Sequence, residues 1–152
     1  MRTLNFIDLF AGAGGLSEGF FRAGFHRLAH LEMDQSACAT LRTRTVYHYL
    51  MQYPYGRELY GQYLKGDIAR DQLYAGVRTS LLDVVVQAEI SWETMAHIFQ
   101  RIDSLVGMQP VDLVLGGPPC QAYSLVGRAR DPQGMRTDRR NFLYQYYGEV
   151  LR

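Results

Sequence analysis

The order of apolar and polar positions along the chain predicts short strands that alternate with helices. Four stretches are apolar over a length that suits a buried strand. These strands are expected at residues 3–10, 27–33, 63–68 and 111–115. Because helical patterns separate them, the strands should be parallel and lie in an α/β sheet wound in the Rossmann manner.

The helices are predicted from caps and from apolar residues at helical spacing. Residues 16–25 follow a glycine turn, and Asp34 is placed as the N-cap of a helix over residues 35–44. A capping-box spacing begins at Ser80. Beyond it, apolar side chains recur at helical intervals at Met95, Ile98, Phe99, Ile102 and Leu105. Residues 139–152 again have helical character.

The length and composition describe one globular domain. The chain has 152 residues, of which 47% are apolar and 20% charged, so it can bury a core and disorder is not expected. No apolar run approaches the roughly 18 residues of a membrane span, so no membrane partner is expected. The two cysteines suggest a reducing compartment, and the cytoplasm fits best.

Positive charge is concentrated in one segment, although the net charge is only +1. Five arginines and two aspartates lie between Arg128 and Arg140, a local charge of +3. Taken alone, such a run is more often a solvated loop. Arg139 and Arg140 open a predicted helix, where basic residues oppose the helix dipole, so a role other than stability is indicated. Asp138 is expected to cap that helix.

A glycine turn and two acidic residues are expected at the ends of the first three strands. Glycines 12, 14 and 15 allow a sharp turn and a close approach of the backbone to a ligand. Glu32 lies twenty residues beyond Gly12, where a carboxylate can accept hydrogen bonds from ribose hydroxyls. Asp67 is expected at the same edge. Singly, each acid is as often a helix cap or a solvated charge, but together they indicate an adenosine pocket.

Cys120 follows two prolines at the end of the fourth predicted strand, in the sequence GGPPCQAYS. Proline lacks an N–H donor and has a fixed φ, so Pro118 and Pro119 stop the strand and stiffen its exit. A side chain placed there is held at the carboxyl end of the sheet, where open α/β sheets bind ligands. The other cysteine, Cys38, lies in a helical pattern and is expected in the core.

Four segments, DLFAGAGGLSEGF, LEMD, GDI and GGPPCQAYS, resemble in this order the first four motifs of the DNA (cytosine-5)-methyltransferases. The segment from Gly127 to Tyr144 is similar to the loop and helix that follow in that family. The resemblance runs from about residue 4 to residue 152, apart from apparent insertions near residues 50–62 and 70–108. It implies a Rossmann-like methyltransferase fold, with residues 1–152 as the N-terminal part of the cofactor-binding and catalytic domain.

The resemblance implies S-adenosylmethionine as the cofactor. Phe10 would pack on the adenine, the backbone of residues 12–15 would carry the methionine part, and Glu32 would hold the ribose. Met33 would lie beside the adenine, with Asp67 and Ile68 on its edge. The residues assigned to the cofactor are Phe10, Ala11, Gly12, Gly14, Gly15, Glu32, Met33, Asp67, Ile68 and Pro119.

The resemblance also implies that Cys120 is the catalytic nucleophile. In this family the thiolate adds to carbon 6 of cytosine, carbon 5 then attacks the sulfonium methyl group, and elimination releases the enzyme. The reacting base must leave the duplex stack, so the expected partner is double-stranded DNA with a flipped cytosine. DNA contacts are assigned to Gln121, Ser124, Arg128 and Arg130, in a loop that contacts phosphate.

Several later parts of that family are not found in the chain: the Glu-Asn-Val and Arg-x-Arg motifs, a target-recognition domain and a closing cofactor motif. The chain is therefore expected to be an N-terminal piece of a bacterial modification methylase, inactive alone. In the family's strand order, 3-2-1-4, the strand at residues 111–115 would then be an edge. The piece is expected to self-associate through that edge or to have residues 127–140 disordered.

Two other functions stay open. A nucleotide-dependent oxidoreductase is disfavoured because Ser17 stands where the dinucleotide fingerprint has glycine. A non-catalytic cofactor- or DNA-binding remnant is the main alternative. The four histidines, His26, His30, His48 and His97, show no ligand spacing with cysteines or acids, so no metal site is expected. Trp92 is expected to anchor the second insertion to the sheet.

Overall fold

The computed structural model describes residues 2–118 and 139–151 of the chain. Its centre is a four-stranded, all-parallel sheet with the order β3-β2-β1-β4. The strands are β1 (Asn5–Leu9), β2 (His26–Glu32), β3 (Val85–Gln87) and β4 (Leu113–Leu115). The predicted α/β, Rossmann-like class is therefore confirmed, and so is the strand order.

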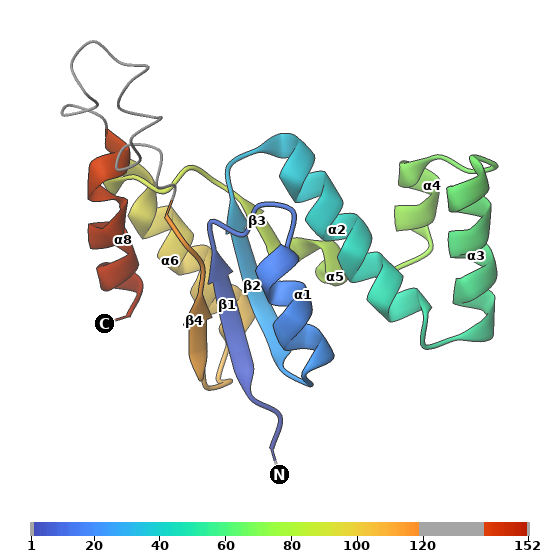
Figure 1. Cartoon of the computed structure of the whole chain (residues 1–152), viewed down its shortest axis with the longest axis horizontal. Coiled ribbons are helices and arrows are strands. Elements are labelled where there is room, and N and C mark those ends of the chain that lie inside the picture. Colours follow the sequence, from blue (N-terminus) through green and yellow to red (C-terminus); the bar gives the residue numbers. More distant parts are fainter. Residues whose placement is uncertain (1, 119–138, 152) are drawn as a thin grey trace.

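Helices cover both faces of the sheet (Figure 1). One face carries α1 (Gly15–Arg22) and α2 (Gln35–Leu50), and the other carries α6 (Trp92–Val106) and α8 (Leu143–Val150), which follows the 3-10 turn η1 (Arg139–Phe142). Side chains of β1 alternate between these layers, as the pleat of a strand requires. Ile7 and Leu9 pack in the cluster that contains Ile98 of α6, whereas the Phe6 ring lies 6.2 Å from that of Phe20 in α1.

A helical extension packs on α2 (Figure 1). It consists of α3 (Pro54–Lys65), α4 (Arg70–Ala75) and α5 (Thr79–Asp83). Its helices α3 and α4 lie away from the sheet, and α5 leads back to the sheet edge. Val46 and Leu50 of α2 are fully buried against Leu73 of α4, and the aromatic residues of α3 pack around them. The extension therefore has a small core of its own.

The third strand was predicted in the wrong place. Residues 63–68 belong to the end of α3 and the turn after it, where Gly66 has a φ of 80°. A short apolar run fits a helix as well as a strand, and here Tyr60 and Tyr63 pack with helical spacing on the core of the extension. The third strand is Val85–Gln87, only three residues long. The capping box expected at Ser80 was also wrong, because Ser80 lies inside α5, whose N-cap residue is Arg78. A capping box is instead formed by Ser91 and Thr94 at the start of α6.

Other local predictions are confirmed. Asp34 caps α2 by accepting a hydrogen bond from the Ala37 N–H at 2.7 Å, and Cys38 is fully buried. The expected role of Trp92 was wrong: the residue is 57% exposed, and its ring contacts that of Tyr146 in α8, with the ring centroids 4.7 Å apart, instead of the sheet. Every helix in the described part of the chain is too short or too polar to cross a membrane.

Polar contacts hold β4 in place at its start and at its middle residue. The Asn5 N–H donates to the Asp112 carboxylate at 2.8 Å, and the Asp112 N–H donates to the Asn5 carbonyl at 3.0 Å. The Tyr147 hydroxyl of α8 donates to the Val114 carbonyl at 2.8 Å. Within the described residues β4 is an edge strand, as expected, and self-association through it stays a prediction.

Candidate functional site

A cavity of about 700 Å³ lies at the carboxyl ends of β1, β2 and β3. This size is typical of a small-molecule site. Loops after these three strands form one side, and the start of α6 together with α8 forms the other. The lining residues are Phe10, Leu31, Glu32, Met33, Ala88, Glu89, Ile90, Ser91, Trp92, Glu93, Gly117, Phe142, Leu143, Gln145 and Tyr146.

The glycine turn after β1 presents Phe10 to the cavity. Phe10 has a φ of 56°, in the left-handed region that a bulky side chain rarely adopts. Such strain is found mainly where function requires it. Gly14, with a φ of 81°, begins α1 so close to α2 that a Cβ atom would lie 2.8 Å from the Leu41 side chain. The sequence therefore uses glycine at this position to seat α1 and phenylalanine to face the cavity.

The Glu32 carboxylate lies at the end of β2 and joins two turns. Its Oε2 accepts a hydrogen bond from the Gly12 N–H at 2.7 Å. Its Oε1 accepts two more, from the N–H groups of Met33 at 2.9 Å and Asp34 at 2.8 Å. A carboxylate has about four acceptor sites, so three are in use and Oε2 keeps one. That site can accept one further donor, such as a hydroxyl group.

The segment after β3 supplies the third side of the cavity. The Ala88 N–H donates to the Glu32 carbonyl at 3.0 Å, which carries the β2–β3 pairing up to the cavity. Glu89 is exposed and lines the cavity, and Ile90 beside it is 7% exposed. Sequence reasoning missed both residues. The sequence pattern that could have identified them is an acid and an isoleucine placed between the run VVVQ and Ser91, the N-cap residue of α6.

Asp67 and Ile68 do not reach the cavity, in contrast to their expected place on the adenine edge. They follow α3, where the Asp67 N–H donates to the Gln62 carbonyl at 3.0 Å and Ile68 packs on the core of the extension. The expectation depended on a strand at residues 63–68, which the chain does not form there. Glu89 and Ile90 occupy the position after β3 that was expected for Asp67 and Ile68.

The described lining of the cavity is acidic. Glu32, Glu89 and Glu93 contribute carboxylates, and no lysine, arginine or histidine is among the described lining residues. Apolar side chains make most of the remaining wall, and three of them, Met33, Trp92 and Phe142, are exposed. The cavity therefore favours a ligand with an aromatic part and positive charge. In the described residues, no three acids, histidines or cysteines gather as a metal would require.

The chain leaves β4 next to the same cavity. Gly116 has a φ of 123°, and a Cβ atom there would overlap the backbone carbonyl of Leu9. This close contact brings Gly117 to the cavity wall. Six of the expected site residues then lie outside the described residues: Pro119, Cys120, Gln121, Ser124, Arg128 and Arg130. The chain re-enters the described part at η1 and α8, which also line the cavity.

Of the remaining expected residues, the structure brings Phe10, Glu32 and Met33 together around the cavity. Ala11 donates its N–H to the Leu31 carbonyl at 3.0 Å, which ties the turn to β2. Gly12 is joined to the site through Glu32, and Gly14 and Gly15 start α1.

The family model of the C-5 cytosine-specific DNA methylases matches residues 4–52. The chain is 39% identical, over 95% of its length, to the Type II methyltransferase M.Bpa9945I of Bacillus paralicheniformis. It is 32% identical over 99% to M1.HphI of Haemophilus parahaemolyticus, and 33% identical over 95% to M.XorII of Xanthomonas oryzae. The matches cover 37%, 29% and 24% of these three relatives, so the chain spans well under half of their length. No solved structure matches the chain.

Proposed function

Because the chain belongs to the C-5 cytosine-specific DNA methylase family, we propose that it forms the cofactor-binding part of an enzyme that methylates DNA. The reaction is the transfer of a methyl group from S-adenosylmethionine to carbon 5 of cytosine. The relatives are bacterial Type II methyltransferases, which supports a role as the modification enzyme of a restriction–modification pair in the cytoplasm. Since the chain spans under half of these relatives, methyl transfer is assigned to a longer protein that contains it.

The observation that carries the cofactor proposal is the acidic cavity with Glu32 at its centre. S-adenosylmethionine carries positive charge on its sulfonium and amino groups, whereas a nicotinamide dinucleotide carries a pyrophosphate. The Glu32 and Glu89 carboxylates favour the first ligand and repel the second. The spare acceptor of Glu32 Oε2 suits one ribose hydroxyl, and the Phe10 ring suits the face of an adenine.

We assign the adenine edge to Glu89 and Ile90 in place of Asp67 and Ile68. Ile90 is buried at the cavity wall and can pack on the base, while the Glu89 carboxylate can accept a hydrogen bond from an amino group. Met33 would cover the ring from the β2 side. Pro119 is assigned to the same site because it comes two residues after Gly117, which lines the cavity.

We assign the catalytic step to Cys120. Its thiolate would form a bond to carbon 6 of a flipped cytosine, which makes carbon 5 nucleophilic. When bound, S-adenosylmethionine supplies the electrophilic methyl group that carbon 5 accepts. Loss of the proton from carbon 5 would then break the sulfur–carbon 6 bond and restore the thiolate. Gln121, Ser124, Arg128 and Arg130 are assigned to DNA, with arginines on phosphate.

Titration calorimetry of the chain tests the cofactor proposal. We expect saturable heat with S-adenosylhomocysteine and S-adenosylmethionine and none with NAD. Glu58→Gln, a charge change on the exposed surface of α3, is the matched control and should leave the affinity unchanged. Binding of NAD in preference to S-adenosylhomocysteine would show that the cavity serves a different cofactor.

Covalent trapping on DNA that contains 5-fluorocytosine tests the nucleophile in the longer protein. The fluorine replaces the proton whose loss allows elimination, so the adduct should persist. Cys120→Ser should abolish both the adduct and methyl transfer, whereas Cys38→Ser should trap normally. Cys38 is a suitable control because burial raises the pKa of its thiol and its sulfur lies 3.4 Å from the Glu32 carbonyl. An adduct that survives in Cys120→Ser would identify another attacking residue.

A further inference from the structure

A second hollow lies where α1, α2, α3 and α4 meet. We call it the α1–α2 cleft. It has a volume of about 490 Å³ and shares no lining residue with the cavity at the strand ends. Its charged and aromatic lining comes from Glu18 and Arg22 of α1, Arg44, Tyr47 and His48 of α2, Tyr60 and Tyr63 of α3, and Arg70 of α4.

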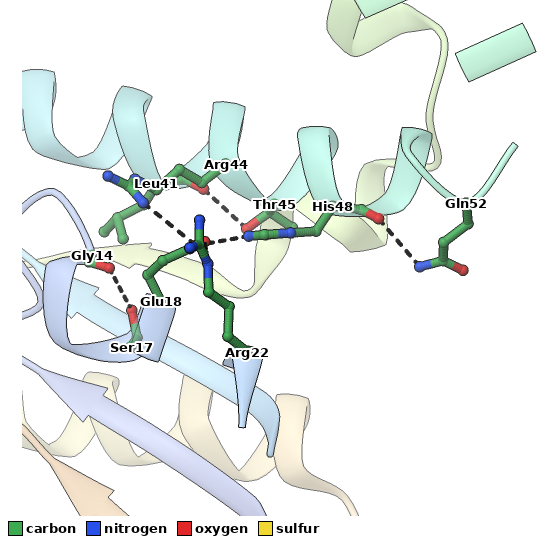
Figure 2. Close-up of polar contacts among 9 residues, drawn as sticks. All are labelled: Gly14, Ser17, Glu18, Arg22, Leu41, Arg44, Thr45, His48 and Gln52. Carbon is green, nitrogen blue, oxygen red and sulfur yellow. Dashed lines mark hydrogen bonds and ion pairs between the residues drawn. The ribbon is translucent and has the colours of Figure 1, made fainter. Parts of the chain in front are cut away.

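Glu18 holds three basic side chains around one carboxylate, as Figure 2 shows. Its Oε1 lies 2.7 Å from Arg22 Nε, and its Oε2 lies 2.8 Å from His48 Nε2 and 3.4 Å from Arg44 Nη1. Burial of Glu18 raises its pKa, but the bonds from His48 and Arg22 outweigh this and leave the pKa below its ordinary value. Glu18 is therefore a fixed anion that orients both guanidinium groups.

The cleft keeps an excess of positive charge after this pairing. Three arginines and one glutamate line it, so the arginines outnumber the acid by two. Arg22 and Arg44 each contact Glu18 through a single nitrogen, so most N–H groups of each planar fork stay available. Arg70, from a different helix, lines the cleft together with Tyr63, whose hydroxyl raises the pKa of Arg70. A carboxylate that orients arginines without neutralising them is suited to a phosphate ligand.

Tyrosines form the wall beside these arginines. The rings of Tyr47 and Tyr60 lie 4.9 Å apart, and those of Tyr60 and Tyr63 lie 5.8 Å apart. Tyr47 is 37% exposed, so part of the aromatic wall is accessible. Cationic groups beside aromatic faces are the combination that binds a nucleotide, because the cations hold the phosphate and the rings stack on the base. The cavity at the strand ends has the opposite charge.

From these contacts we propose that the α1–α2 cleft is a second binding site, which takes the phosphate and base of a nucleotide. The nucleotide is either free or part of a DNA strand. The site is separate from the proposed cofactor site and does not depend on it. If the arginines only fastened α1 to α2, the cleft would be indifferent to anions.

Ligand titrations followed by NMR amide shifts of the chain test this site with three probes: inorganic phosphate, deoxycytidine monophosphate and a short DNA duplex. We expect saturable shifts around Arg44 and His48, with the nucleotide binding more tightly than phosphate. The variant Arg22→Gln/Arg44→Gln should weaken nucleotide binding at least tenfold. The matched control, Arg101→Gln on α6, removes a charge from the other face and should bind as the unchanged chain does.

The comparison among the probes identifies the source of the phosphate. If the duplex displaces the nucleotide, the phosphate belongs to DNA. The slope of the logarithm of duplex affinity against the logarithm of salt concentration should then be smaller by about 2 in the double variant. Nucleotide binding without displacement identifies a free nucleotide. Binding that is equal in the double variant, or absent for all three probes at millimolar concentration, would overturn the proposal. S-adenosylhomocysteine should not compete, and its titration reports on the cofactor site alone.

Discussion

Replacement of Glu32 is the most informative perturbation of the proposed cofactor site. Three of its acceptor positions are taken by the N–H groups of Gly12, Met33 and Asp34, and only Oε2 can accept a ligand hydroxyl. The structure thus predicts one charged hydrogen bond to the ribose. A hydrogen bond to a charged group contributes about 1.5–3 kcal/mol, so Glu32→Ala should weaken S-adenosylhomocysteine binding by roughly 10- to 150-fold.

The same substitution should also destabilise the fold, because it removes the acceptor that ties the β1 turn to the β2 turn. The Gly12 bond is partly buried and the other two are exposed, so we expect a cost of about 1–2 kcal/mol and a fall in Tm of roughly 3–6 °C. Differential scanning fluorimetry measures this loss. Glu32→Gln should lose affinity as well, because its amide group would place a donor against a backbone N–H.

Adenosine analogues separate the two effects of Glu32. Adenosine, 2′-deoxyadenosine and 3′-deoxyadenosine are titrated into the unchanged chain and into Glu32→Ala. In the unchanged chain only one of the two deoxy analogues should lose affinity strongly, and in Glu32→Ala that difference should vanish. The assignment fails if the folded Glu32→Ala variant still distinguishes the analogues as the unchanged chain does.

Three further substitutions, two of them with a matched control substitution, test other parts of the structure. Glu89→Ala should weaken S-adenosylhomocysteine binding by about tenfold, whereas Asp67→Ala should not, and the reverse result in calorimetry would return the adenine contact to Asp67. Gly116→Ala should destabilise the chain by more than about 3 kcal/mol in urea unfolding, because a Cβ atom there overlaps a backbone carbonyl, while Gly117→Ala, with open space, should change little. Because the folded pKa of Glu18 lies below its ordinary value of 4.5, its ionised form stabilises the fold above that pH. Glu18→Gln should therefore lower Tm near neutral pH, and this difference should disappear as the pH falls through the folded pKa; a constant difference would refute the ionic role.

The sequence predicts the first half of the sheet well, because local signals specify it. The glycine turn, the Asp34 cap and the spacing to Glu32 all lie within about thirty residues, and the structure brings Phe10 and Glu32 to one cavity. The prediction of the third strand failed because a strand of three residues is too short to show the alternation of apolar and polar side chains. Residues 63–68 matched a strand by composition alone.

The remaining features depend on contacts between residues far apart in the sequence. The α1–α2 cleft joins Arg22, Arg44 and Arg70, which no local pattern connects. The need for glycine at position 116 likewise comes from the Leu9 carbonyl, more than a hundred residues earlier. Such features need the fold before they can be seen.

The pairing of β1 with β4 also has a consequence for the time course of folding. β1 is made first and is central in the sheet, yet the Asp112 carboxylate that meets the Asn5 N–H lies 107 residues later. At about 5–20 residues per second of synthesis, β1 keeps one open edge for roughly 5–20 s after it emerges. Its β2 side can pair within that interval, since β2 begins at His26. The sheet therefore grows outward from a half-paired centre, and the cavity gains its last described walls only when the chain after β4 arrives.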